Sequence, residues 1–257
     1  MSTCLFPILA GLTYIYTTAM RHSVYKLRQK FAIRPKIRKF LNSYLMMNYA
    51  ADTELYFRLK SLETTCAYIQ AHMLHVPTLT NKFDLMMFAL SKAPREGLYC
   101  EFGVFKGESL AFMKANIPQD VHGFDSFEGL PEYWRPGFTE GTFKVKKVPR
   151  FKKGVHLHIG WFNDTIPKFV AEYGTQKIAF LHVDCDLYSS TKAIFEGLLN
   201  QIQDGTIILF DEYFNCPNWE EHEYKAFQEF IQKNNYSYEY LAYNCKGYQV
   251  AVRVKKK

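Results

Sequence analysis

The chain of 257 residues lacks several features by which common protein classes are recognised. It has no internal repeat and no low-complexity segment, and 48% of its residues are hydrophobic against 22% charged. That balance excludes collagen, solenoid repeats and a disordered chain. It also lacks the series of apolar runs, each of about 20 residues, that a multi-span membrane protein needs. At this length roughly 70–75% of the unfolded surface can be buried, so folding requires no disulfide or metal.

Cysteine is sparse and shows no metal-binding spacing. The six cysteines form no C-x-x-C pair, and no pair of histidines completes a zinc site. Cys100 and Cys185 lie inside apolar runs. We therefore expect them to be buried free thiols of a protein in a reducing compartment.

Acidic residues are absent from positions 1–51, which contain eight lysines and arginines. The remaining residues carry 24 basic against 25 acidic side chains, so the net charge of +7 belongs to the N-terminal arm. No basic stripe is apparent through the rest of the chain, which disfavours nucleic-acid binding. The arm is either solvated charge or a segment attracted to an anionic membrane surface.

The first residues include one apolar run, Leu5 to Met20, interrupted by Pro7 and Gly11. It is too short for a typical spanning helix, and its positive charge follows it, whereas a signal peptide begins with positive charge. Three interpretations stay open: a helix packed on the body or a partner, an interfacial helix with residues 21–39 at the headgroups, or a short signal-anchor. We expect a cytoplasmic protein with membrane contact, if any, through residues 5–39.

The pattern of apolar residues predicts two regions. Residues 1–75 are expected to form a helical N-terminal extension and residues 76–257 the main domain, with Pro77 at the boundary. In the main domain strands alternate with helices, which predicts an α/β fold with a mostly parallel sheet and helices on both faces. A final hairpin predicts an antiparallel edge strand. The expected strands are 97–102, 121–124, 155–159, 178–183, 206–210, 236–240 and 248–254, and the expected helices 81–92, 109–115, 166–173, 190–201 and 219–234.

Ligands of such sheets bind at the carboxyl ends of the strands, so the residues there are the candidate site. Gly103 and Gly107 follow the first strand in a turn that feeds a helix, and Asp125 lies 24 residues after Glu101. That offset is close to the ~20 residues at which an acid meets ribose hydroxyls, so the pattern predicts a bound nucleoside. The candidate cofactor residues are Glu101, Gly103, Gly107, Ser109, Asp125, Ser126, Gly160, Trp161 and Phe162.

Trp161 and Phe162 follow the third strand, and the sequence leaves two interpretations of their rings open. Either ring would stack on an adenine, or it would pack in the core.

Four carboxylates follow two further strands of the expected sheet. Asp184 and Asp186 come after 178–183, and Asp211 and Glu212 after 206–210. Unpaired carboxylates ~4 Å apart repel by about 1 kcal/mol even in water, and a divalent cation removes that cost. An all-oxygen set favours Mg²⁺, Ca²⁺ or Mn²⁺. Otherwise Asp186 caps the next helix and Glu212 is a solvated surface residue.

Five blocks of sequence stand out in order along the main domain. They are Glu101-Phe-Gly-Val-Phe-Lys-Gly107, Asp125-Ser-Phe-Glu-Gly-Leu-Pro-Glu132, Gly160-Trp-Phe-Asn-Asp-Thr-Ile-Pro167, Asp184-Cys-Asp-Leu-Tyr-Ser-Ser-Thr191 and Phe210-Asp-Glu-Tyr213. Together they resemble the macrocin O-methyltransferase family of class I S-adenosylmethionine (SAM) enzymes, and the resemblance covers roughly residues 78–254. Members of that family methylate hydroxyls on deoxysugars of macrolides and related glycosides.

The resemblance implies a Rossmann-like methyltransferase fold with a seven-stranded sheet. It implies that Glu101 and Gly103 line the methionine and ribose of SAM and that Asp125 holds the ribose hydroxyls. It also implies that Asp184, Asp211 and the residue at 212 bind Mg²⁺. Position 212 is usually Asp in the family and is Glu here, whose longer side chain can still reach a metal. Residues 1–75 do not match the family, so the identity of the acceptor does not carry over.

The function expected from these features is SAM-dependent, metal-assisted methylation of a sugar hydroxyl. Asp184 would act as general base or only as a metal ligand. The long segment 126–154 carries Tyr133, Trp134, Phe138 and Phe143 and would form a lid with faces for stacking on a sugar.

Two alternatives stay open: methylation of a catechol-like phenol, and a non-catalytic SAM-binding module recruited to a membrane. A dehydrogenase is disfavoured by the glycine spacing. Self-association into a homo-oligomer is also expected from the resemblance.

Overall fold

The computed structural model describes residues 37, 39–41, 43–44 and 52–257. The apolar run 5–20, and the basic arm except Ile37 and Lys39, lie outside the described residues. The chain divides into two compact units, Met1–Leu55 and Tyr56–Lys257. The fold below is that of the second unit, whose first helix begins at Thr53, just before the boundary. Among the helices that the structure describes, none is long and apolar enough to cross a membrane.

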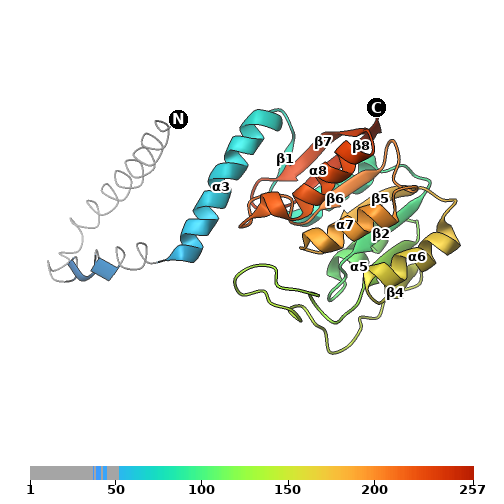
Figure 1. The fold of residues 1–257 in the computed structure, drawn as a ribbon, viewed down its shortest axis with the longest axis horizontal. Coiled ribbons are helices and arrows are strands. Elements are labelled where there is room, and N and C mark those ends of the chain that lie inside the picture. The colour runs from blue at the N-terminus through green and yellow to red at the C-terminus, as the bar shows by residue number, and fades with distance from the viewer. Residues whose placement is uncertain (1–36, 38, 42, 45–51) are drawn as a thin grey trace. The chain divides into compact units, whose positions relative to one another are not determined.

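Helices and strands alternate through the second unit (Figure 1). The helices are α3 (Thr53–His72), α4 (Lys82–Lys92), α5 (Glu108–Asn116), α6 (Phe162–Tyr173), α7 (Tyr188–Gly197) and α8 (Glu223–Lys233), with a 3₁₀ turn at Trp219–Glu221. The strands are β1 (Thr78–Leu79), β2 (Leu98–Phe102), β3 (Val121–Asp125), β4 (Val155–Ile159), β5 (Ile178–Val183), β6 (Ile207–Phe210), β7 (Tyr236–Asn244) and β8 (Val250–Lys256).

The strands form one mixed sheet in the order β1-β7-β8-β6-β5-β2-β3-β4. β8 runs antiparallel to both β6 and β7, and the other pairs are parallel, which confirms the predicted fold class. The predicted count of seven strands was wrong: this sheet has eight. The extra strand, β1, is a two-residue segment after Pro77 that pairs with the end of β7, too short to produce a period-2 pattern.

Helices cover both faces of the sheet because side chains alternate along each strand. Cys100 and Phe102 of β2 point toward the core under α6, α7 and α8, whereas Tyr99 points toward the core under α4 and α5. Figure 1 shows α6, α7 and α8 together on the near side of the sheet. The buried thiols expected at Cys100 and Cys185 are present, both free.

Two element boundaries differ from expectation near the site. α6 begins at Phe162 rather than Ile166, so Pro167 lies inside the helix rather than in its first turn. α7 begins at Tyr188, directly after the second acidic segment. Both helices therefore start closer to the carboxyl ends of their strands, and their first turns border the site.

Candidate active site

A cavity of about 730 Å³ opens at the carboxyl ends of β2, β3, β5 and β6. Its volume lies in the range typical of small-molecule sites. The structure brings together around it eleven of the twelve residues predicted for the site. These are Gly103, Gly107, Ser109, Asp125, Ser126, Gly160, Trp161, Phe162, Asp184, Asp211 and Glu212. The exception is Glu101, which is completely buried beneath the cavity.

The turn after β2 depends on glycine and on Asp125. Gly103 has φ +95°, and a Cβ there would lie 1.6 Å from the carbonyl oxygen of Asp184, so no larger residue fits. Asp125 accepts hydrogen bonds from the amides of Val104 and Phe105, both at 2.8 Å, and from Phe127 at 2.6 Å. A carboxylate has about four lone-pair positions, so Asp125 shapes the turn and can still accept a bond from a ligand hydroxyl.

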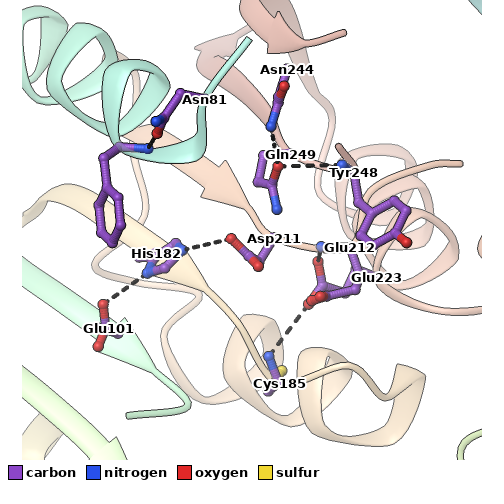
Figure 2. A network of polar contacts seen from close by, with 11 residues as sticks. Asn81, Glu101, His182, Cys185, Asp211, Glu212, Glu223, Asn244, Tyr248 and Gln249 are labelled. Atoms are coloured by element: carbon purple, nitrogen blue, oxygen red, sulfur yellow. Dashed lines mark hydrogen bonds and ion pairs between the residues drawn. The ribbon is translucent and has the colours of Figure 1, made fainter. Parts of the chain in front are cut away.

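Three charged side chains form a row across adjacent strands, on the face covered by α4. His182 Nδ1 lies 2.8 Å from Glu101 Oε2, and His182 Nε2 lies 3.6 Å from Asp211 Oδ1 (Figure 2). The register explains the row: Glu101 pairs with His182, and Asp211 follows directly after β6. Burial by itself lowers the pKa of His182, but Asp211 and Glu101 outweigh it and raise that pKa to about 10. The imidazole is therefore a cation that bridges two carboxylates.

Lys82 is a second cation at this cluster, and the sequence analysis did not single it out. It begins α4, directly after Asn81, whose side chain accepts from the Phe83 amide at 2.8 Å and caps the helix. Lys82 lines the cavity. Burial acts to lower its pKa, but Asp211 and Asp184 raise the pKa above the usual value for lysine.

The acidic residues themselves crowd together in a buried space. Burial and repulsion by Asp211 raise the pKa of Asp184, and burial together with Asp186 raises that of Glu212. The pKa of Asp211 is lowered in spite of its burial, chiefly because the imidazole of His182, 3.6 Å away, attracts its carboxylate. Within the described part of the chain, Glu212 Oε2 is a buried oxygen with no hydrogen-bond partner.

This cluster suits a hard divalent cation. Single ligand atoms of His182, Asp184 and Asp211 lie within 4.8 Å of one another. Asp184 and Asp211 offer two carboxylate oxygens for such an ion, and the unpartnered oxygen of Glu212 is a third candidate donor. These are the three residues proposed from the sequence, and an all-oxygen set is the one that Mg²⁺, Ca²⁺ or Mn²⁺ prefers.

Glu223, at the start of α8, joins the two acidic segments. Its side chain is completely buried, and its oxygens accept from the backbone amides of Cys185 at 3.4 Å and Glu212 at 3.0 Å (Figure 2). One carboxylate thus fixes the spacing between the loops after β5 and β6. Sequence reasoning missed Glu223, because an acid in the first turn of a helix is ordinary.

The segment 126–154 borders the cavity as expected, through Phe143 among others. Its aromatic residues differ in role, however. Trp134 is buried against Leu130 and Leu187, and the Arg135 guanidinium lies 3.9 Å from its ring centroid, so it anchors the segment rather than offering a free face. Tyr133 is exposed.

Comparison with known proteins finds methyltransferases similar to this part of the chain. Residues 100–213 match the model of a family described as a methyltransferase domain. The sequence is similar to a tetracenomycin rhamnosyl 4′-O-methyltransferase of Streptomyces olivaceus, at 28% identity over 167 residues, 54% of this chain and 62% of the relative. It is also similar to demethyldecarbamoylnovobiocin O-methyltransferase of Streptomyces niveus, at 26% over 142 residues, 46% of this chain and 53% of that one.

Solved structures show the same fold. The calicheamicin methyltransferase CalS11 aligns with a TM-score of 0.55 and 20% identity over 92% of this chain and 91% of its own. The O-methyltransferase NovP aligns with a TM-score of 0.52 and 20% identity over 68% and 80%. The resemblance to sugar O-methyltransferases noted in the sequence is thus confirmed. The chain matches less than two thirds of the length of either curated relative.

Proposed function

We propose that the protein is a SAM-dependent O-methyltransferase that transfers a methyl group to a hydroxyl of a sugar or glycoside. One observation carries the proposal: a single cavity joins the glycine turn held by Asp125 to the carboxylates Asp184, Asp211 and Glu212. The glycine turn suits a nucleoside, and the carboxylates suit a hydroxyl that must be positioned and deprotonated. One curated relative is named as the 4′-O-methyltransferase of a rhamnosyl-tetracenomycin, which supports this acceptor class.

On this proposal the turn and the first residues of α5 and α6 hold SAM. Asp125 accepts from a ribose hydroxyl, and Gly103 lets the backbone approach the ligand closely. Trp161, which is 42% exposed and lines the cavity, is available to stack on the adenine. Glu101 would act indirectly, by holding His182, because its side chain faces that residue rather than the cavity.

The acceptor hydroxyl would lie between the sulfonium and the acidic residues. A sugar hydroxyl has a pKa far above 7, and a divalent cation held by Asp184, Asp211 and Glu212 would acidify and position it. Asp184 would take the proton as general base, in addition to its role as ligand.

Binding and turnover of the full chain test the proposal separately. Calorimetric titration of S-adenosylhomocysteine, with Mg²⁺ and then with EDTA, should give micromolar affinity in both conditions, and absence of binding in both would refute the methyltransferase. A panel of glycosides and catechols, read by mass spectrometry, then separates the sugar from the phenol acceptor. Asp184→Asn should abolish turnover and leave the affinity for S-adenosylhomocysteine nearly unchanged. Binding without turnover on any acceptor would instead favour the non-catalytic module.

A further inference from the structure

The segment between β3 and β4 ends in a strongly basic stretch, residues 144–153, called here the basic strap. It contains six basic residues and no acidic one: Lys144, Lys146, Lys147, Arg150, Lys152 and Lys153. Residues 52–257 carry 24 basic and 25 acidic residues in all, so the rest of this region has an acidic excess. The near-zero net charge of residues 52–257 therefore conceals a local cluster of positive charge, which the sequence analysis did not identify.

The apolar residues of the basic strap fix its orientation. Val145, Val148 and Phe151 pack against the core under α4 and α5. The ring of Phe151 lies over Gly107, where an added Cβ would be 2.3 Å from its Cζ. With these residues turned inward, all six basic side chains are exposed.

Most of this charge is not neutralised by the protein itself. Lys144 pairs with Glu128. The other five basic residues of the strap form no ion pair with any residue that the structure describes. The strap is thus a fixed, outward-facing row of cations rather than half of an internal salt-bridge network.

The basic strap lies beside the mouth of the cavity. Phe143, which precedes it, and Gly107, on which Phe151 packs, both line the cavity. At the same rim Phe105 and Phe143 are each 37% exposed, with ring centroids 5.5 Å apart. The Lys106 ammonium lies 5.0 Å from the Phe105 ring centroid. Exposed apolar rings flanked by cations are the combination that lets a surface sit among lipid headgroups.

We propose that the basic strap and this aromatic rim dock the protein on an anionic lipid membrane, with the cavity mouth toward the headgroups. A membrane is favoured over a nucleic acid because the sequence of the same chain also joins an apolar run, residues 5–20, to eight basic residues with no acid among them. Docking does not depend on the proposed methyl transfer. That the acceptor is itself carried by the membrane would rest on the proposed function.

Co-sedimentation of the full chain with vesicles tests the docking surface. The vesicles are phosphatidylcholine alone or phosphatidylcholine mixed with phosphatidylglycerol. Each basic residue near an anionic surface strengthens binding roughly fivefold. The variant K146Q/K147Q/K152Q/K153Q should therefore bind the anionic vesicles at least tenfold more weakly than the parent chain. All four side chains are exposed, so the variant should melt at the parent temperature.

A matched control removes the same charge elsewhere on the domain, by glutamine at Lys168, Lys192, Lys233 and Lys246, all exposed. This control should bind anionic vesicles like the parent chain, and S-adenosylhomocysteine affinity should be the same in all three proteins. Equal weakening of both variants would overturn the proposal, since net charge alone would then explain binding. Strap-dependent binding to an oligonucleotide or to heparin, with none to vesicles, would also overturn it in favour of a soluble polyanion.

Discussion

Glu223 offers a direct test of how the acidic segments are held in place. In Glu223→Gln one carboxylate oxygen becomes an NH₂ group, which cannot accept a hydrogen bond. The shorter bond, from the Glu212 amide at 3.0 Å, should persist, and the bond from Cys185 at 3.4 Å should be lost. The loop that carries Asp184 and Asp186 then has a buried amide without an acceptor.

The magnitude follows from that single loss. A buried, unsatisfied donor costs about 1–3 kcal/mol. For a domain of this size each kcal/mol lowers the melting temperature by roughly 2–4 °C. A displacement of about 1 Å at a catalytic group can reduce turnover about 10²-fold. We therefore expect a melting temperature lower by ~2–12 °C and turnover lower by about tenfold to a hundredfold.

The assay must separate positioning from general stability. Turnover and S-adenosylhomocysteine affinity are measured for Glu223→Gln well below its melting temperature. Glu229→Gln serves as control, because Glu229 is an exposed acid on the same helix, bonded at 2.6 Å to the Tyr188 hydroxyl. Turnover of Glu223→Gln equal to that of the control would refute the reasoning. A parallel loss of affinity for S-adenosylhomocysteine would also refute it, because that would indicate a general disruption of the site.

Three further predictions concern other parts of the domain. Gly103→Ala should lower the free energy of unfolding by several kcal/mol in chemical denaturation, because its Cβ would meet a carbonyl oxygen. The control Gly137→Ala, at φ +86° with no atom within 4 Å of the added Cβ, should lower it by only ~1–2 kcal/mol. Lys82→Gln removes a cation facing the acidic cluster and should tighten Mg²⁺ binding about threefold to tenfold by calorimetry; weaker binding would contradict this. Burial lowers the pKa of His122 to about 4, so the native state holds fewer protons than the unfolded state between pH 6.5 and 4, and stability falls as pH drops through that window. His122→Asn should make the melting temperature depend less on pH over the same range. An unchanged slope of melting temperature against pH would assign the acid sensitivity to other groups.

The sequence predicted the cavity well because its signals are local. Glycines and acids placed directly after apolar runs identify strand ends, and in a parallel sheet those ends meet at one edge. That reasoning brought Asp125, Asp184 and Asp211 to one site. It required no knowledge of which strands are neighbours.

The residues it missed depend on contacts between distant segments. His182 becomes a bridging cation only because β5 lies between β2 and β6, an order that periodicity does not encode. Glu223 is recognisable only once its complete burial beneath two loops is known. Trp134 was interpreted as a free stacking face because exposure within a long loop cannot be inferred from its composition.

The contact between Gly103 and Asp184 has a thermodynamic consequence. The backbone of the turn that would receive the methyl donor abuts the peptide of Asp184, and the amide of Asp184 in turn donates to the Phe102 carbonyl at 2.9 Å. A ligand that shifts the turn therefore also shifts an oxygen of the cation site. Donor and cation would then bind as linked ligands, each changing the affinity of the other by the same factor.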